Sequence, residues 1–256
     1  MAAAGVFFVL VWFRDSLVDT TRRGWHRIEA RLVRKRFVLL WIDDQSISEK
    51  LCGHLSRLDS EGNLYRVLDR PTSISLYPLS EQIVRAIIIL DTDVSKLADS
   101  DSAQVRLQQQ LGHYVSRGGA LIASHDVIYR RVRCTELQDM FGCTITEFYQ
   151  CPPEEKVHYQ VDAKAANHPI RAGLSDNFEL DDGEVVAGPS WPPDVDVIYA
   201  TADSQSHPLV VTREYAQGKL VWLNSGDKGD YMCQSLARPE EPLVRLLVNC
   251  VNWAGR

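Results

Sequence analysis

The chain lacks three features that would each point to a different class of protein. Its six cysteines include no Cys-x-x-Cys pair, so the ligand spacing of a structural zinc site is absent. Its longest apolar run, at residues 2–13, has 12 residues, whereas an ordinary transmembrane helix needs roughly 20. No basic residues precede that run, as they would in a secretory signal. No internal repeat is visible.

The composition fits a soluble globular protein. The 256 residues are 45% hydrophobic and 24% charged, which is ordinary for such proteins, and the chain is long enough to bury one large core. The scattered cysteines suit a reducing cytosol, where most would be buried as small hydrophobic side chains. We therefore expect a cytoplasmic protein with one domain at residues 36–256 and an N-terminal extension at residues 1–35.

The charge is distributed unevenly along the chain. The formal net charge is −6, yet residues 22–36 contain seven Arg or Lys and one Glu. The remainder is therefore strongly acidic, which argues against a nucleic-acid partner.

The N-terminal extension leaves several interpretations open. Residues 22–36 could form an amphipathic helix that touches anionic lipid or a partner, with Trp25, Ile28, Leu32 and Val33 roughly on one side. They could equally form a solvated helix docked on the domain. The apolar residues 2–13 could be an extra buried strand or a clipped membrane anchor.

Three apolar runs predict buried parallel strands, because both faces of such strands are covered. They occupy residues 37–42, 83–90 and 120–123. Each run stops on polar residues, which are Asp43 and Asp44 after the first, Asp91, Thr92 and Asp93 after the second, and Ser124, His125 and Asp126 after the third. In open α/β sheets, ligands bind at the carboxyl ends of the strands, so the site is expected there.

The segments between and after these strands complete the predicted fold. Helices are expected at residues 48–58 and 102–115, the second with Val105, Leu107, Leu111 and Val115 inward and with Gly118-Gly119 closing it. Further strands are expected at residues 64–68, 142–148, 157–161, 178–180, 195–200, 208–213 and 218–223, and a last helix at residues 242–253. The pattern predicts a flavodoxin-like, doubly wound, mostly parallel α/β sheet with helices on both faces and an antiparallel excursion in the second half.

Several motifs together resemble one known family. They are Asn167-His168-Pro169-Ile170-Arg171-Ala172-Gly173-Leu174 followed by Phe178-Glu179-Leu180, then the stretch from Pro208 to Trp222, and the Gly-Gly strand that ends at Ser124-His125. In this order they resemble the ThuA-like (trehalose-utilisation) family of the class I glutamine amidotransferase-like superfamily, over residues 36–256. The resemblance implies a flavodoxin-like sheet with His125 at the turn where true amidotransferases place a nucleophilic cysteine.

The sequence departs both from the pattern of true amidotransferases and from that of the ThuA-like family. The nearest cysteine, Cys134, lies nine residues beyond His125, so we do not expect glutamine hydrolysis through a thiolate. The family commonly carries Gly-His-Asp after a late strand, and this chain has Asn224-Ser225-Gly226-Asp227 there, with Asp227 in place of the histidine.

The candidate site residues come from several strand ends. Ser124, His125 and Asp126 cannot form a relay by themselves, since adjacent residues of an extended chain point to opposite faces. We predict catalytic roles for His125, Asp91 and Asp227, and ligand-binding roles for Asp43, Asp44, Ser124, Asp126 and Asn224. A histidine among carboxylates could act as a general base or hold a divalent metal. Asp44 and Asp126 could instead cap the helices that follow them.

Two functions remain open. The first is an enzyme that acts on a small carbohydrate-derived metabolite through His125 and a strand-end carboxylate. The second, favoured by the missing cysteine and by Asp227, is a non-amidotransferase module that binds a small polar metabolite or a protein partner. Residues 1–35 could add a peripheral membrane contact, and a strand pair of the second half could form a homodimer. No cofactor and no metal ligand is assigned.

Overall fold

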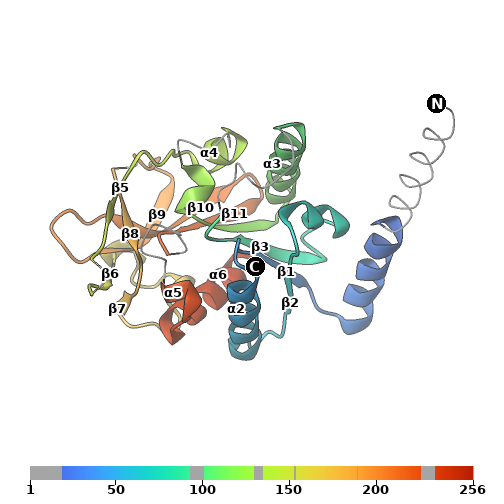
Figure 1. Ribbon diagram of the computed structural model, residues 1–256, viewed down its shortest axis with the longest axis horizontal. Coiled ribbons are helices and arrows are strands. Elements are labelled where there is room, and N and C mark those ends of the chain that lie inside the picture. Colours follow the sequence, from blue (N-terminus) through green and yellow to red (C-terminus); the bar gives the residue numbers. More distant parts are fainter. Residues whose placement is uncertain are drawn as a thin grey trace.

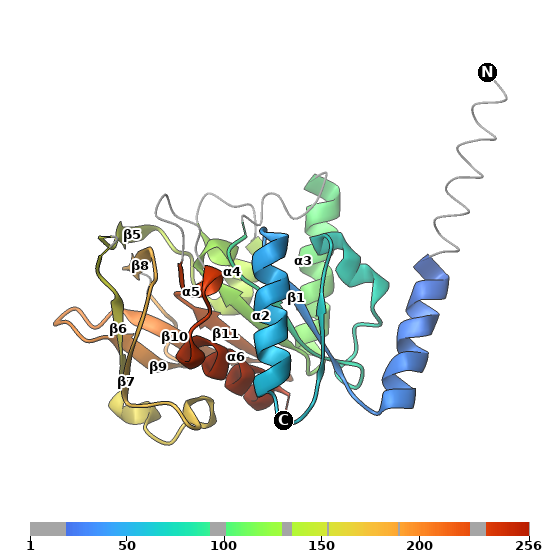
Figure 2. The same cartoon turned by 60° about the horizontal axis from the view of Figure 1, so that its bottom comes forward.

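A computed structural model describes residues 19–92, 101–129, 135–152, 154–188, 190–225 and 234–255, with residues 125 and 126 described without their side chains. Helices lie on both faces of a central sheet, as Figures 1 and 2 show. The strands of this sheet are β1 (Phe37–Trp41), β2 (Leu64–Val67), β3 (Val84–Ile89), β4 (Ala120–Ser124), β6 (Val157–Val161), β7 (Asn177–Leu180), β9 (Val195–Thr201), β10 (Pro208–Tyr215) and β11 (Gly218–Leu223).

The sheet has a parallel half and an antiparallel half. Its order is β2-β1-β3-β4-β11-β10-β9-β6-β7. The pairs from β2 to β11 are parallel, and those from β11 to β7 are antiparallel. The doubly wound sheet with its antiparallel second half is therefore confirmed.

The longer helices cover the two faces of the sheet. Helices α2 (Gln45–Leu58) and α6 (Glu241–Ala254) pack on one face, and α3 (Asp101–Ser116) and α4 (Thr135–Phe141) on the other (Figure 1). Shorter helices are α5 (Gln234–Ala237) and the 3-10 helices η1 (Pro71–Leu76), η3 (His125–Ile128), η4 (Ala163–Ala165) and η5 (Pro169–Arg171). Side chains alternate along a strand, so alternate residues of β1 belong to opposite cores: Val38 and Leu40 lie in the core that contains α2, and Phe37 and Leu39 lie in the core on the other face, where Phe37 packs against His26 and Tyr77.

Two local expectations were wrong. Val105 is 43% exposed, because the buried residues of α3 follow the helical spacing of Gln104, Leu107 and Leu111 and leave Val105 to one side. The strand expected at residues 142–148 runs instead over β5 (Glu147–Gln150). It pairs with β8 (Glu184–Ala187), a strand that the sequence pattern did not reveal, in a separate two-stranded sheet.

The Gly-Gly pair joins α3 to β4 as expected. Gly118 has a φ of +102°, a conformation that side chains other than glycine rarely adopt. A Cβ atom on Gly119 would lie 2.4 Å from the ring of Tyr114. The Tyr114 hydroxyl donates to the carbonyl of Val84 on β3, at 3.1 Å. The two glycines therefore let the end of α3 press a buried tyrosine against the sheet just before β4 begins.

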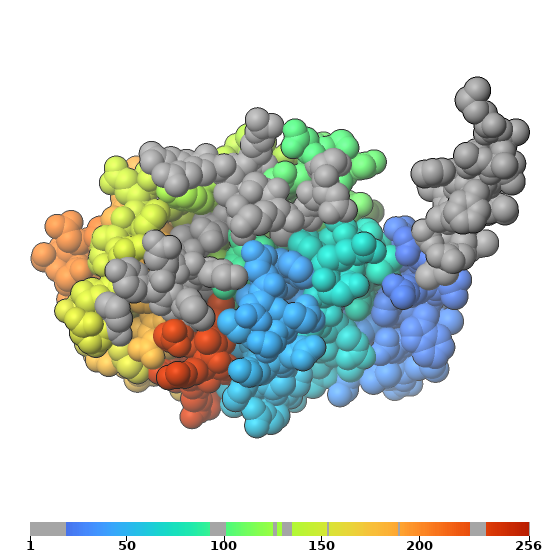
Figure 3. Space-filling model, viewed as in Figure 1, coloured from blue at the N-terminus to red at the C-terminus, as the bar shows by residue number. Residues whose placement is uncertain are grey.

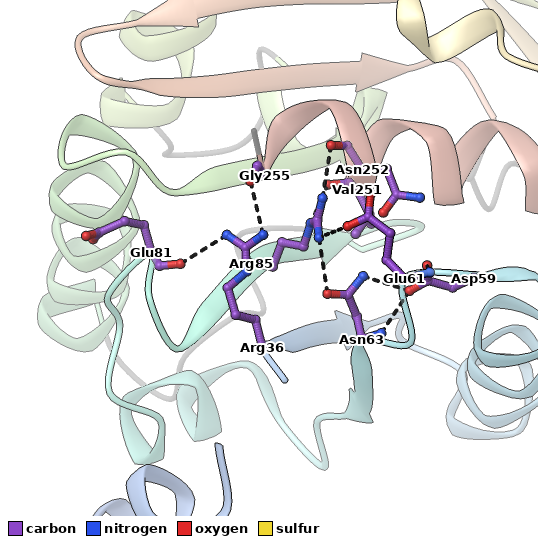
Figure 4. A network of polar contacts seen from close by, with 9 residues as sticks. All are labelled: Arg36, Asp59, Glu61, Asn63, Glu81, Arg85, Val251, Asn252 and Gly255. Atoms are coloured by element: carbon purple, nitrogen blue, oxygen red, sulfur yellow. Dashed lines mark hydrogen bonds and ion pairs between the residues drawn. The ribbon is translucent and has the colours of Figure 1, made fainter. Parts of the chain in front are cut away.

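Two arginines anchor the C-terminal end of α6 to the edge of the sheet at which the parallel strands begin, which we call the amino edge (Figure 4). Arg85 of β3 is buried and donates to the carbonyls of Val251 and Asn252, at 3.1 and 3.0 Å, and it pairs with Glu61. Arg36 donates to the carbonyl of Gly255 at 3.1 Å. The last carbonyls of a helix lack some of their partners within the helix. Arg85 supplies a donor to the carbonyl of Asn252 and a second donor to that of Val251, which also accepts from the N–H of Gly255 at 3.1 Å.

We expect Arg85→Met to lower the free energy of unfolding by about 3 kcal/mol, because it removes the donor to the Asn252 carbonyl and the partner of the Glu61 carboxylate. Arg245→Met is the matched control, since Arg245 pairs with Glu241 on the exposed side of the same helix, and its cost should stay near or below about 0.5 kcal/mol. Urea unfolding of the three proteins measures the difference. Equal costs for the two variants would show that the anchor contributes no more than a surface ion pair.

Candidate functional site

The strand ends of the parallel half lie level with one another. Trp41 of β1 pairs with Ile89 of β3, and Ile89 pairs with Ala123 of β4. Leu223 of β11 pairs with Ser124. The polar residues that follow these strands are therefore placed along one edge, which confirms the expectation that the three strands end side by side.

Hydrogen bonds connect the strand ends of β1, β3 and β4. The backbone N–H of Asp91 donates to Oγ of Ser124 at 3.0 Å, and the N–H of Asp43 donates to the carbonyl oxygen of Asp91 at 3.4 Å. The Thr92 hydroxyl donates to the carboxylate of Asp43 and accepts a bond from Nε1 of Trp41 at 3.0 Å. Asp43, Asp91 and Ser124, predicted from separate stretches of sequence, thus form one connected group with Thr92.

Asp91 has an unusual backbone conformation. Its φ is +45° and the residue is buried. Left-handed backbone at a non-glycine residue costs free energy and persists where the surroundings hold it in place. Here the bond from its N–H to Ser124 and the bond to its carbonyl from Asp43 provide that support.

Asp44 has a structural role in addition to the predicted one. It is exposed and is the N-cap of α2, where its carboxylate accepts bonds from the N–H groups of Ser46 and Ile47 at 2.8 and 3.2 Å. This confirms the capping interpretation for Asp44. Its role in ligand binding stays a prediction.

The structure describes the other predicted catalytic residues only in part. His125 and Asp126 open η3 directly after Ser124, so the His125 backbone stands one residue from the contact with Asp91. Asp227 and Asp93 lie outside the described residues. The pairing of His125 with Asp91 and Asp227 remains a prediction.

Asn224 follows β11 at the same edge and is buried. Its Oδ1 accepts from the N–H of Val186 at 3.0 Å, and its Nδ2 donates to the carbonyl of Glu184 at 2.8 Å and to the carboxylate of Asp182 at 3.3 Å. The amide thus ties the end of β11 to β8. A ligand that Asn224 binds would have to share this amide with those contacts.

A buried carboxylate beside Asn224 was missed by sequence reasoning. Asp182 accepts bonds from the hydroxyls of Tyr159 and Ser235 as well as from Asn224, and the Ser235 hydroxyl also lies 2.8 Å from that of Ser225. Burial raises the pKa of Asp182, although these donors oppose the shift. In the sequence, Asp182 is one acid among several between two short strands, so nothing singled it out.

The cysteines of the described residues do not supply a reactive thiolate. Burial raises the pKa of Cys143 to about 12 and that of Cys151 to about 11, and it raises the pKa values of Cys52 and Cys250 as well. Thiols of this kind stay protonated at neutral pH and are poor nucleophiles. Cys134 and Cys233 lie outside the described residues.

Two features are absent from the residues that the structure describes. In that part of the chain, no group of three or more His, Cys, Asp or Glu side chains is arranged to hold a metal ion. Within the same residues, no helix has both the length and the apolar character needed to cross a membrane.

The raised pKa of Asp182 predicts a pH-dependent stability. The folded state holds this proton more tightly than the unfolded chain, so the free energy of unfolding should fall as pH rises from about 4, the usual carboxyl value, through the raised pKa. Asp182→Asn should remove that fall when denaturant unfolding is measured between pH 4 and 8.

Asp203→Asn serves as a control of opposite sign. Slight desolvation at Asp203 is outweighed by hydrogen bonds from Thr201 and from the N–H groups of Ser206 and Gln205, which lower its pKa. Asp203 should therefore stabilise the fold above about pH 4 and lose that contribution as pH falls. An Asp182→Asn curve parallel to the wild type would contradict the proposed titration.

The chain is similar in structure to several solved proteins. A cytoplasmic protein, STM3548 from Salmonella typhimurium, is 14% identical with a TM-score of 0.61, and the match covers 86% of this chain and 98% of that one. A protein from Parabacteroides merdae ATCC 43184, described as ThuA-like, is 13% identical with a TM-score of 0.57, over 86% of this chain and 90% of that one.

One further neighbour is much longer than this chain. A β-galactosidase from Bacillus circulans sp. alkalophilus is 10% identical with a TM-score of 0.56, and the match covers 85% of this chain but 30% of the enzyme. Identities this low establish a shared fold alone. No curated protein matches the chain.

A family model assigns the chain to a family, which sequence identities as low as these cannot do. The model for ThuA, trehalose utilisation, matches residues 82–254, well over half of the chain. This range contains β3, β4 and β11, three of the strands whose ends form the site. The chain therefore belongs to the ThuA (trehalose utilisation) family, as the motifs around Asn167–Leu174 and Pro208–Trp222 predicted.

Proposed function

We propose that this ThuA-family chain binds a small polar metabolite at the carboxyl edge of β1, β3, β4 and β11 and does not hydrolyse glutamine. The observation that carries the proposal is the hydrogen-bonded group formed by Asp43, Asp91, Thr92 and Ser124 where β1, β3 and β4 end side by side. Such edges are the usual ligand sites of open α/β sheets, since the loops that follow the strands diverge there.

The loss of amidotransferase chemistry is supported by the residue that follows β4. His125 stands where the resemblance places a nucleophilic cysteine. An imidazole cannot replace a thiolate as the group that forms the thioester with glutamine. The described thiols have pKa values raised by burial, which argues against another cysteine taking over.

The chemistry of the edge favours a ligand rich in hydroxyl groups. The carboxylate oxygens of aspartate residues such as Asp43 accept hydrogen bonds, whereas serine and threonine hydroxyls can donate or accept. A polyol or sugar offers hydroxyl donors, while an anionic ligand would be repelled by such carboxylates. A neutral, carbohydrate-derived metabolite in the cytoplasm is the ligand class that we propose.

An enzymatic role is the second candidate, and the backbone of Asp91 favours it. Strained, buried residues of this kind are common in active sites. In this alternative, His125 acts as a general base toward a sugar hydroxyl, and Asp91 or Asp227 holds the imidazole in position. Turnover of the ligand, with loss of activity in His125→Ala, would distinguish catalysis from binding.

A thermal-shift screen tests the proposal. Wild-type protein is screened against sugars, polyols, sugar acids and glutamine, and each stabilising compound is tested again on His125→Ala and Ser124→Ala. A ligand at 100 times its dissociation constant stabilises the folded state by about 2.7 kcal/mol, so its effect is easily measured. We expect neutral polyhydroxyl compounds to stabilise the wild type and to lose most of that effect in both variants.

His158→Ala is the matched control, because His158 is exposed on β6 and pairs with Glu179 away from the parallel strand ends. It should keep the full ligand response. Stabilisation by glutamine together with ammonia release would contradict the proposal. So would a ligand response that survives in both site variants.

A further inference from the structure

The helix at residues 19–33 docks on the domain through one side only. On that side the His26 ring stacks on Tyr77, with ring centroids 4.2 Å apart, and Glu29 pairs with Arg66 of β2 at 2.6 Å. Ala30 is buried on the same side. These contacts hold the helix against the β2 side of the sheet, where Figures 1 and 2 show it at one end of the molecule.

Another side of this helix carries an apolar stripe that the domain leaves largely exposed, although its Trp25 also borders a cavity lined by Val67, Leu68 and Tyr77 of the domain. Trp25, Ile28 and Leu32 are 61%, 50% and 76% exposed. Their spacing of three and four residues places them on one side of the helix, turned away from Ala30. Figure 3 shows the helix at one end of the molecule. We call Trp25, Ile28 and Leu32 the apolar stripe.

Basic side chains lie along the same helix as the stripe. Arg23, Arg27, Arg31 and Arg34 are all exposed, and residues 22–36 hold seven Arg or Lys against one Glu, whereas the whole chain has a net charge of −6. The positive charge is therefore concentrated on this helix and on the three residues directly after it, of which Arg36 bonds to the carbonyl of Gly255 at the end of α6. An anionic surface would attract the helix and repel the acidic remainder of the chain.

We propose that the apolar stripe and its arginines bind the surface of an anionic phospholipid bilayer. Tryptophan and leucine side chains enter the boundary between headgroups and acyl chains, and arginines beside them pair with lipid phosphates. Charge complementarity favours a lipid surface over a protein partner with a localised acidic patch, because the basic residues are spread along the helix. The apolar stripe and these arginines would hold the protein at a membrane by one end.

Vesicle co-sedimentation of the full chain tests the proposal. The probes are vesicles of phosphatidylcholine alone and vesicles with 30% phosphatidylserine, in 0.1 M and 0.5 M NaCl. We expect binding to the anionic vesicles only, and weaker binding at the higher salt. Equal binding to both kinds of vesicle would contradict the proposal that the arginines bind anionic lipid.

Two double variants separate the apolar and charged contributions. Trp25→Ser with Leu32→Ser should weaken binding at least about tenfold, since both side chains lose burial in the membrane. Arg27→Gln with Arg31→Gln should weaken it about thirty-fold, because each cation near an anionic surface contributes on the order of a fivefold gain.

The controls make the same chemical changes elsewhere. Val105→Ser with Phe148→Ser removes two exposed apolar side chains from other surfaces, and Arg57→Gln with Arg106→Gln removes two exposed cations. Both should bind vesicles as the wild type does.

Two results would overturn the proposal. The first is wild-type binding that survives in both helix variants, because another segment would then make the contact. The second is no vesicle binding at all, together with a dimer that Trp25→Ser and Leu32→Ser convert to a monomer. The stripe would then be an interface between two copies of the chain.

Discussion

The main-chain hydrogen bonds that keep β1, β3, β4 and β11 parallel and level are the constraint on which the candidate site depends. Pairing such as Ile89 with Ala123 brings the ends of strands far apart in sequence to one line. A slip of one residue would turn each strand's side chains to the other face and would separate Asp91 from Ser124. The site is thus a property of the sheet register before it is a property of any single residue.

The two edges of this sheet have different roles. At the amino edge, Arg85 and Arg36 bind the last carbonyls of α6 and hold the C-terminal helix in place. At the carboxyl edge, the polar residues after the strands bond to one another, and the strained backbone of Asp91 lies among them. The C-terminal helix is anchored at the amino edge, so the ligand that we propose for the carboxyl edge would not disturb that anchor.

Much of the fold could be predicted because its signals are local. Continuous apolar runs identified β1, β3 and β4. Asp43 and Asp91 could be singled out because they are the acids that directly follow two of these runs. Long-range contacts carry no such signal. The Asn224 amide bonds to Asp182 and to the carbonyl of Glu184 on β8, which lie about 40 residues away in the sequence. Val105 was misplaced because an apolar residue beside a helical face resembles one on it, and the roles of His125 and Asp227 require side-chain positions that a pattern cannot give.

The most direct test of the central claim is an NMR titration of the full chain with a ligand that stabilises it. A ligand at the carboxyl edge should shift the backbone amides of Asp43, Asp91, His125 and Ser225, which follow four different strands, together and with one dissociation constant. Shifts confined to the amino edge, where a cavity of about 350 Å³ is lined by Asp162, His168 and Asp196, would contradict it. In that case the strand ends would be a structural element and the ligand site would lie elsewhere.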